Sequence, residues 1–388
     1  MQTYPVVALD GCTDYDIESI AKILKQQLIS VGMTEEILSG KKVVLKPNLV
    51  MSKNPDYAAT THPAVIAGAA RALRSMGAAE LLLAESSGGP YTETTMRLHY
   101  GGCGIKEMAQ QENITLNYKT DAAMMQFPAG STCRSFHVIQ PICDADIVVN
   151  ICKLKTHSLT KMSCGVKNLY GVIPGTEKVE MHARFSRLES FSEMLCDLAQ
   201  MLLESKTMIT ICDGICGMEG NGPTGGTPRE YGVLMTSLSP FALDLVCEHL
   251  MGFDGTVPTV QASIRRGLCP ADITQLAVIG ADYKNHITNN VVPPDTSRRS
   301  ILRDFPDLFG GRLVRFLEPR PKIDQNKCVA CGVCAASCPQ KTIFIREKDG
   351  KKRLKIQDKN CIRCYCCQEM CPKNAVKIQK NFILRIVR

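Results

Sequence analysis

Two runs of closely spaced cysteines near the end of the chain constrain this sequence more than any other feature. They read CVACGVCAASCP from Cys328 and CIRCYCCQEMCP from Cys361, and both fit the pattern C-x2-C-x2-C-x3-C-P. An iron–sulfur cluster needs soft thiolates that converge on one small volume, and two-residue gaps let a single loop supply three of them. The runs therefore predict two [4Fe–4S] clusters, each of which takes a fourth thiolate from elsewhere in the chain.

Zinc is the alternative metal for paired cysteines. Zinc sites use two C-x2-C pairs, which leaves the third and fourth cysteines and the proline after each run unexplained. The runs also belong to an internal repeat, since the apolar segments IFI at 343–345 and AVKI at 375–378 follow them. From about Pro321 onward the chain resembles the bacterial two-cluster ferredoxin domain, which implies a small α+β iron–sulfur domain.

In the two-cluster arrangement the last cysteine of each run crosses to the other cluster. The expected ligand sets are Cys328, Cys331, Cys334 and Cys371 for one cluster, and Cys361, Cys364, Cys367 and Cys338 for the other. Cys366 is left as a spare thiol. The stretch REKDGKKRLKI departs from the ferredoxin pattern and predicts a hairpin with its turn at Asp349 and Gly350.

Charge divides the chain into two unequal parts. Residues 321–388 contain 16 Lys and Arg against 5 Asp and Glu, whereas residues 1–320 contain 30 against 33. The clusters bring negative charge that offsets part of this surplus. The remainder is either a solvated basic face or a surface that attracts an acidic redox partner such as ferredoxin or flavodoxin. Nucleic acid is not expected, because the basic residues lack interleaved aromatics and no binding motif occurs.

The compartment is predicted from the N-terminus and the cysteines. The opening MQTYPVVALDGCTDYD has no basic segment followed by an apolar one, so it does not read as an export signal. No apolar run reaches the roughly 18 residues that a membrane helix requires. We therefore expect a cytoplasmic protein with no membrane segment, in which the 20 cysteines stay reduced and are available to metals.

Residues 1–288 alternate apolar runs with helical patterns. The runs KKVVLK, AELLLAE, DADIVVNIC, TMITICD and QLAVIG are separated by helical patterns that include residues 63–75, 187–204 and 240–250. Continuous apolar strands between amphipathic helices predict an α/β domain, with a mainly parallel sheet covered by helices on both faces. Residues 289–320 predict a linker, in which FPDLFGGRLVRFL forms a short amphipathic helix, and residues 321–388 form the second domain.

Polar residues follow four of the predicted strands. KKVVL leads into Lys46-Pro47-Asn48, AELLL into Glu85-Ser86-Ser87, DIVVNI into the basic segment KLKTH, and MITIC into Asp213. A single polar residue after a strand is more often a solvated loop residue or a helix cap. Ligands of open α/β sheets bind beyond the carboxyl ends of the strands, so four such ends together predict a binding site.

The segment CKLKTHSLTKMSCGVKN at 152–168 carries four lysines and one histidine and no carboxylate. Alternate residues of an extended segment point the same way, so Lys153, Lys155 and His157 are expected to line one wall of the site. With Lys167 they offer positive charge and a proton donor that works near neutral pH. Such a set suits a small anionic substrate, either a carboxylate or a phosphate.

Other candidate residues complete the predicted site. Lys46, Asn48 and Asn168 are further candidate anion ligands. Asp213 and Glu219 are candidates to balance charge, orient a lysine or exchange protons. The glycines of DGICGMEGNGPTGGTPRE allow backbone N–H groups to approach a ligand, although a long surface loop is the alternative. Standard nucleotide binding is not predicted, because no P-loop occurs and no G-x-G-x-x-G follows a strand.

Four more cysteines lie in or beside these segments. Cys152, Cys164, Cys212 and Cys216 could in principle hold a further metal, but they form no C-x2-C pair. Free cysteine is commonly a small buried hydrophobe. Whether this group binds a metal is left open by the sequence.

The motifs KPNLV, TTHP, KLKTH with GVKNLYG downstream, and DGICGMEGNGPTGG together resemble the family called domain of unknown function 362, which is often fused to a ferredoxin module. The resemblance covers residues 1 to about 280 and implies no particular reaction. One hypothesis is a ferredoxin-dependent oxidoreductase, in which the clusters pass electrons to a small anionic substrate. The other is a non-catalytic electron carrier or an accessory protein of metal-cluster assembly, whose α/β domain binds a partner or ligand. The lysines and histidine favour the enzyme, and the lack of a flavin or nicotinamide motif favours the carrier.

Overall fold

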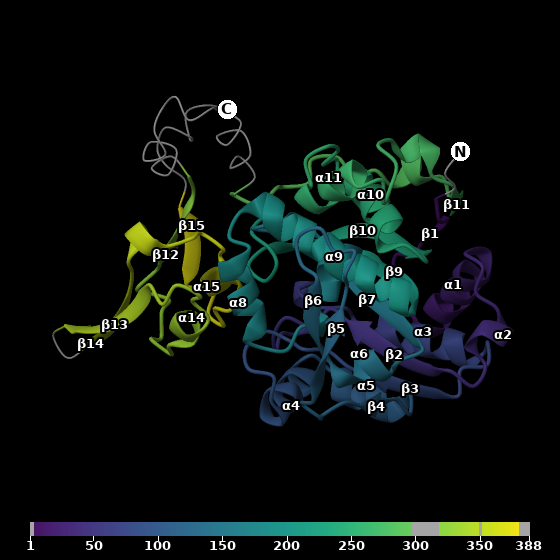
Figure 1. The fold of residues 1–388 in the computed structure, drawn as a ribbon, viewed down its shortest axis with the longest axis horizontal. Coiled ribbons are helices and arrows are strands. Elements are labelled where there is room, and N and C mark those ends of the chain that lie inside the picture. Colours follow the sequence, from purple (N-terminus) through teal and green to yellow (C-terminus); the bar gives the residue numbers. More distant parts are fainter. Residues whose placement is uncertain (1–3, 297–317, 349–350, 380–388) are drawn as a thin grey trace.

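The computed structural model describes residues 4–296, 318–348 and 351–379. These residues form a large α/β domain and a smaller cysteine-rich module at one end of it (Figure 1). Most of the predicted linker, including the FPDLFGGRLVRFL segment, lies outside the described residues. Its first residues, 289–296, pack on the α/β domain, where Asn221 and Asp295 exchange two hydrogen bonds of 2.8 and 2.9 Å.

A mixed sheet of nine strands forms the centre of the large domain, and eight of them run in the order β11-β1-β10-β9-β7-β2-β3-β4. One block of the sheet is parallel throughout and contains β9, β7, β2, β3 and β4. Strand β10 is antiparallel to both β9 and β1. The ninth strand, β8, pairs with the end of β7. Their bounds are β1 Val7–Gly11, β2 Lys42–Pro47, β3 Glu80–Leu83, β4 Thr115–Leu116, β7 Ile147–His157, β8 Lys161–Ser163, β9 Thr207–Glu219, β10 Thr227–Ser237 and β11 Val278–Gly280.

Helices cover both faces of this sheet, and successive buried side chains of β7 pack into cores on opposite faces. Val149 and Ile151 pack into a core with α1, α3 and α5, while Val148, Cys152 and Leu154 face the opposite side, where α9 and α10 pack. The helices are α1 Ile17–Ser30, α2 Glu35–Leu38, α3 Pro63–Arg74, α4 Glu93–Gly102, α5 Ile105–Gln111, α6 Gln140–Asp144, α7 Gly165–Asn168, α8 Glu177–Arg184, α9 Leu188–Ser205, α10 Pro240–Leu250 and α11 Pro258–Arg265. A separate hairpin, β5 Ala122–Gln126 with β6 Ser135–Ile139, packs beside α6. The predicted α/β fold is therefore confirmed.

Local sequence explains where the predicted helices begin. The α10 helix starts at Pro240, whose fixed backbone suits the first helical position, and the Ser239 hydroxyl caps it by accepting the N–H of Ala242 at 3.3 Å. The α3 helix likewise starts at Pro63, with His62 as its cap. The helices expected at 63–75, 187–204 and 240–250 are found within one residue of those bounds.

Two strands are longer than the sequence predicts. The KLKTH segment was expected to follow its strand, but it forms the last five residues of β7, which pair with β8 and β9. Much of the glycine-rich stretch after Asp213 likewise belongs to β9, which runs to Glu219 before a short connection to β10. A side chain at Gly217 would meet the Leu154 carbonyl oxygen, with its Cβ only 2.1 Å away. The glycines thus allow close strand packing, and the alternative of a long surface loop is wrong.

The C-terminal module is built from two small strand pairs and two short helices. Strand β12, Arg320–Ile323, pairs antiparallel with β15, Val376–Gln379, and β13, Ile343–Lys348, pairs with β14, Lys351–Ile356. The predicted hairpin in REKDGKKRLKI is therefore confirmed. The helices are α14, Val333–Ala336, and α15, Cys366–Glu369.

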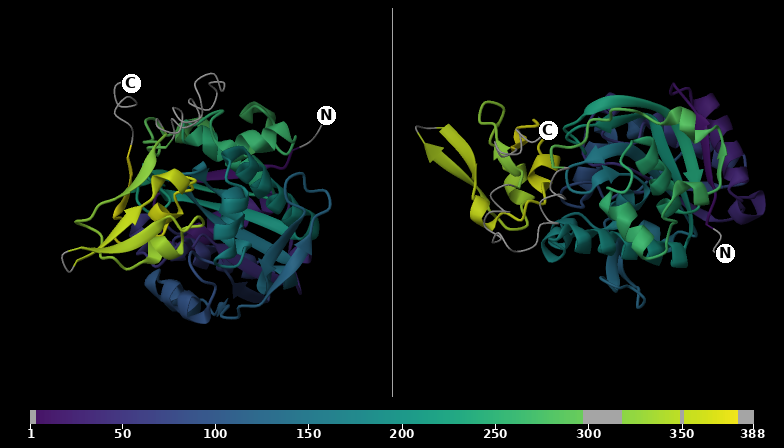
Figure 2. Two further views of the ribbon diagram at one scale, coloured as in Figure 1. Left: turned by 60° about the vertical axis from the view of Figure 1, so that its left-hand side comes forward. Right: turned by 90° about the horizontal axis from the view of Figure 1, so that it is seen from above.

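The module docks on the connection between β9 and β10 (Figure 2). The side chain of Gln368 donates to the Asn221 carbonyl at 2.9 Å, and the hydroxyl of Thr224 donates to the Glu369 carbonyl at 3.0 Å. These contacts place α15 directly against the α/β domain.

Candidate functional site

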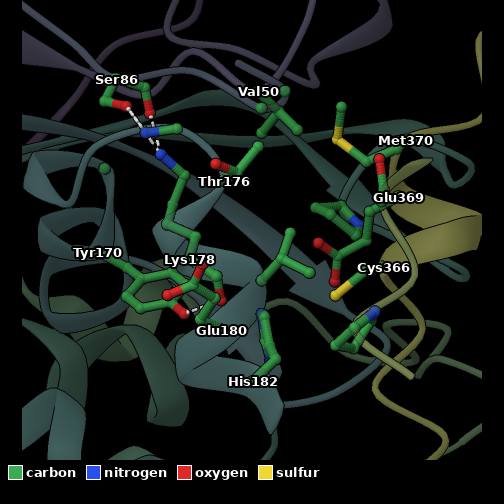
Figure 3. A pocket seen from close by; sticks show the side chains of 18 of the residues that line it. Val50, Ser86, Tyr170, Thr176, Lys178, Glu180, His182, Cys366, Glu369 and Met370 are labelled. Atoms are coloured by element: carbon green, nitrogen blue, oxygen red, sulfur yellow. Dashed lines mark hydrogen bonds between the residues drawn. The ribbon is translucent and has the colours of Figure 1, made fainter. Parts of the chain in front are cut away.

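A cavity of about 660 Å³ lies between the α/β domain and the cysteine-rich module. Figure 3 shows Ser86, Tyr170 and Lys178 on one side of it and Cys366, Glu369 and Met370 on the other. The walls come from the segments after β2 and β3, the end of β7, the chain from α7 to α8, and from α14 and α15 of the module. Its charged and amide side chains include Asn48, Glu85, Lys155, His157, Lys167, Asn168, Lys178, Glu180, Arg184, Lys341 and Glu369.

Lys155 is held in the cavity wall by a chain of amides. Its ammonium donates to Asn48 Oδ1 at 2.7 Å and to the Ala59 carbonyl. Asn48 in turn donates to Asn168 Oδ1 at 2.9 Å, and Asn168 donates to Asn150 Oδ1 at 2.8 Å. Burial lowers the pKa of Lys155 to about 7, against the opposing influence of the Glu369 carboxylate. The side chain can therefore both hold and release a proton near neutral pH.

Two further lysines reach the same cavity from the segment after β8. Lys178 donates to the carbonyl and hydroxyl of Ser86 at 2.7 and 2.9 Å, and burial lowers its pKa to about 7. The ammonium of Lys167 lies 4.5 Å from the centre of the Tyr170 ring, a cation–π contact. Within the described part of the chain, Lys167 has neither an ion pair nor a hydrogen-bond acceptor. Its charge is therefore available to a ligand.

His157 faces the module from the end of β7. Its Nδ1 accepts the N–H of Leu159 at 3.0 Å, so the proton of the neutral ring lies on Nε2, which is 3.2 Å from Glu369 Oε1. Burial, together with Lys167 and Lys155, lowers the pKa of His157 well below its usual range. In this arrangement the ring is neutral with its proton on Nε2, and proton exchange by His157 near neutral pH stays a prediction.

Glu369 brings a carboxylate from the module close to Lys155 and Lys167. Burial raises the pKa of its carboxyl, whereas Lys167 and Lys155 lower it. Its Oε1 is buried and makes no well-aligned hydrogen bond with any residue that the structure describes. A buried oxygen of this kind calls for a further polar partner, such as a ligand or an ordered water.

Four of the predicted site residues lie outside the cavity lining. Lys153 sits beside Asp213 in the parallel register of β7 and β9 and forms a fully buried ion pair with it at 2.8 Å. Lys46 is also fully buried and pairs with Glu85, whose carboxylate does line the cavity. Glu219 accepts the N–H of Val292 at 3.0 Å at the far end of β9. The structure thus brings together Lys155, His157, Lys167, Asn48 and Asn168, but not Lys46, Lys153, Asp213 and Glu219.

Glu85, Lys178 and Glu369 line the cavity without having been predicted as site residues. Glu85 follows β3, so its position at a strand end was the available signal. Lys178 lies in α8 and Glu369 lies inside the second cysteine run, where no local pattern points to the cavity. Only the docking of the two domains brings these two residues to the site.

The cysteines of the module surround two small cavities. One is lined by Cys328, Cys331, Cys334 and Cys371, and the other by Cys338, Cys361, Cys364 and Cys367. Each group offers four thiols to one small volume, which is the donor set of a [4Fe–4S] cluster. Cys338 also lines the large cavity, and Cys331 is exposed to solvent. The second group is thus next to the lysines, while the first reaches the surface.

Two protein-family profiles match this chain. The profile described as domain of unknown function (DUF362) matches residues 43–249. The chain belongs to the DUF362 family. A 4Fe-4S dicluster domain matches residues 327–375, so the C-terminal module is an iron–sulfur domain of ferredoxin type.

One relative is similar over most of its length. The thylakoid-associated protein sll1697 of Synechocystis sp. (strain ATCC 27184 / PCC 6803 / Kazusa) is 32% identical over 274 residues, which are 68% of this chain and 80% of that protein. No helix in the described parts of this DUF362 chain is long and apolar enough to cross a membrane.

Two solved structures are more distantly similar. The lactate racemase apoprotein from Thermoanaerobacterium thermosaccharolyticum shares 14% identity over 54% of this chain and 51% of its own, with a TM-score of 0.34. A protein from Thermotoga maritima shares 14% identity over 60% of this chain and 58% of its own, with a TM-score of 0.35. This chain spans little more than half the length of either.

Proposed function

We propose that this DUF362 protein is an oxidoreductase that reduces a small anionic substrate in the cavity between its two domains, with electrons from two [4Fe–4S] clusters. The observation that carries the proposal is that Lys155 and Lys167 of the α/β domain and Cys338 of the iron–sulfur domain line the same cavity. A substrate held by the lysines would lie beside a cluster-binding loop.

Bound [4Fe–4S] clusters would supply single electrons at low potential, held by the two groups of four cysteines named above. The exposed Cys331 lies between Val329 and Val333, whose side chains are 60% and 36% exposed. These residues offer a surface at which an acidic redox partner such as ferredoxin or flavodoxin could dock and donate electrons. Cys338, which lines the cavity, belongs to the group from which the electrons would leave.

The cavity residues suit an anion with an apolar portion. Lys155, Lys167 and Lys178 supply positive charge, and charge-assisted hydrogen bonds to a carboxylate or phosphate are about twice as strong as neutral ones. Asn48 and Asn168 each keep one amide N–H beyond those already used within the chain. Val50 and Val179 provide apolar wall nearby. Small carboxylates and phosphate esters are therefore the substrate classes that this lining favours.

The lysines also account for the proton balance of a reduction. Two-electron reduction of a substrate consumes two electrons, one from each cluster, and two protons. Lys155 can give up one proton because its pKa lies at about 7, and solvent supplies the other proton and then recharges the lysine. His157 orients the substrate or Glu369 through its Nε2–H and keeps its own proton.

Anion-dependent thermal stabilisation tests the proposed binding site. Small carboxylates and phosphates should raise the melting temperature of the anaerobically purified protein, because a ligand that binds only the folded state stabilises it. Lys155→Met and His157→Gln should lose that increase while keeping their iron. Lys161→Met is the matched control, since Lys161 lies in the same basic segment but bonds to Thr256 outside the cavity.

The non-catalytic alternative makes the opposite prediction. A carrier or assembly protein whose α/β domain binds a partner or ligand would not pass electrons from its clusters to a small anion, so no anion would oxidise its reduced clusters. If no carboxylate or phosphate stabilises the wild-type protein, or if Lys155→Met is stabilised as much as the wild type, the enzyme proposal fails.

A further inference from the structure

Four buried cysteines meet on the face of the sheet that packs against α10. Cys152 on β7 and Cys212 on β9 are direct neighbours in the parallel register, so their side chains lie side by side on that face. Cys164, the residue before α7, and Cys247 of α10 cover them from above. None of the four is more than 1% exposed. We call them the four-cysteine cluster.

The sulfur atom of Cys164 lies close to the other three sulfurs of the cluster. The Sγ of Cys164 lies 3.4 Å from that of Cys152, 3.6 Å from that of Cys212 and 3.3 Å from that of Cys247. The Sγ atoms of Cys247 and Cys212 are 3.9 Å apart. The three sulfurs of Cys152, Cys164 and Cys212 all lie within 4.8 Å of one another.

For Cys152, Cys164 and Cys212 these separations suit thiolates around a single metal ion, whereas the sulfur of Cys247 is not within 4.8 Å of all three and has to shift to join them. A tetrahedral zinc site with bonds of about 2.3 Å keeps its sulfur ligands about 3.8 Å apart. An iron–sulfur cluster would not fit, because its core would have to occupy the space in which these sulfurs already touch. We propose that the four-cysteine cluster is a structural zinc site, with Cys152, Cys164 and Cys212 as three ligands and Cys247 as the fourth.

The surroundings suit a closed structural site. Asp244, one turn before Cys247 on α10, accepts the N–H groups of Gly165 and Val166 at 2.6 and 3.2 Å, which fixes the start of α7 beside Cys164.

The ion would join the elements that carry the cavity. Strand β7 bears Lys155 and His157, and α7 bears Lys167 and Asn168. A zinc ion bonded to Cys152 and Cys164 would tie these two elements together directly. The sequence-based set included Cys216 in place of Cys247, but Cys216 is partly exposed and its sulfur is not among those that converge.

Metal analysis of the intact protein tests this site. The full chain, purified anaerobically and dialysed against EDTA to remove loosely held ions, should retain about one zinc in addition to the iron and sulfide of its clusters. X-ray absorption at the zinc edge should show four sulfur neighbours at about 2.3 Å and no oxygen or nitrogen. This second measurement needs no variant, so it holds even if a substitution prevents folding.

Matched cysteine variants locate the ion. Cys164→Ser should lose the zinc and keep the iron. Two control variants should keep the zinc: Cys196→Ser, at a fully buried thiol on α9, and Cys364→Ser in the iron–sulfur domain. Less than about a tenth of a zinc per chain, a disulfide between Cys152 and Cys164, or zinc that disappears with Cys364→Ser and not with Cys164→Ser would overturn the proposal.

Discussion

His157 of the α/β domain and Glu369 of the iron–sulfur domain meet across the domain interface, with Nε2 of the ring 3.2 Å from Oε1 of the carboxylate. Glu369 lies between Cys367 and Cys371, which belong to different groups of cluster-binding cysteines. A ligand that contacts His157 or Glu369 is thus adjacent to a loop that carries cysteines of both groups. This contact is the most direct link between the cavity and the proposed electron path.

Neutralising Glu369 should strengthen anion binding. Glu369→Gln removes a negative charge from a cavity that Lys155 and Lys167 make basic, while the amide keeps the size of the side chain. We expect the affinity for a stabilising anion to rise roughly tenfold, or about 1.4 kcal/mol. Isothermal titration against Glu347→Gln, an exposed carboxylate of the same domain, provides the comparison. An unchanged affinity in Glu369→Gln would show that the anion binds elsewhere.

Anion affinity should fall as the pH rises through about 7, because Lys155 loses its proton there. Lys155→Arg keeps its charge throughout this range, so its affinity should fall less steeply with pH. The charged groups that influence the pKa of Lys155 are Glu369, Lys167, Lys153 and Glu85. Titrations between pH 6 and 9 check the profile, and equal slopes for the two proteins would rule out Lys155 as the titrating group.

The lowered pKa of Lys155 also makes the folding stability depend on pH. The pKa of Lys155 is 10.5 in its ordinary state and about 7 in the folded protein, so between these values the unfolded chain binds the extra proton. The contribution of Lys155 to stability therefore rises with pH from about 7 to 10.5, and below pH 7 the folded state bears the full cost of burying the charge. Urea denaturation of Lys155→Met should show a shallower rise across this window than the wild type does.

The cavity shows which features could be predicted from the sequence and which could not. The cysteine runs are local patterns, and the apolar strands imposed the parallel sheet, so both were predictable. The wall of the cavity was less predictable. Strand β7 extends through Lys153 and Lys155 because it pairs with β8 and β9. Strand β9 is distant in the sequence, and β8 has only a weak sequence pattern. That extension leaves Lys153 beside Asp213, inside the domain, and carries only Lys155 and His157 to the cavity.

Residues from the second domain could not be assigned in this way. Glu369 reaches the cavity because α15 docks against the connection between β9 and β10, and that docking depends on contacts such as Gln368 with Asn221. Cys247 joins the four-cysteine cluster because α10 packs over the sheet. In both cases residues far apart in the chain meet through tertiary packing, for which the sequence has no periodic signal.

The Lys153–Asp213 pair should be important for stability and not for anion binding. Both side chains are fully buried, and removing one partner of such a pair typically costs about 3–5 kcal/mol. We expect Asp213→Asn to lower the free energy of unfolding by that amount and to keep its anion-dependent stabilisation. Glu219→Gln is the control, because its contact with Arg229 is 3.6 Å long and partly exposed, and should cost less than about 1 kcal/mol.

Iron content should distinguish the ligand cysteines from Cys366. The two groups of four thiols predict about eight irons per chain with matching acid-labile sulfide. Cys364→Ser should lose iron, whereas Cys366→Ser should keep all of it, since Cys366 lines the large cavity and neither of the two small ones. Loss of iron in Cys366→Ser would contradict this ligand assignment.

Anaerobic reoxidation of the reduced protein tests the central claim most directly. The clusters are reduced in excess over any residual reductant and mixed with a panel of small carboxylates and phosphate esters, while their visible absorbance reports oxidation. The account predicts that at least one of these anions accelerates reoxidation in the wild type and in Lys161→Met, and that Lys155→Met and Lys167→Met lose the acceleration although their iron content is unchanged. Reoxidation that no anion accelerates, or that persists in both cavity variants, would contradict reduction of an anionic substrate at this site.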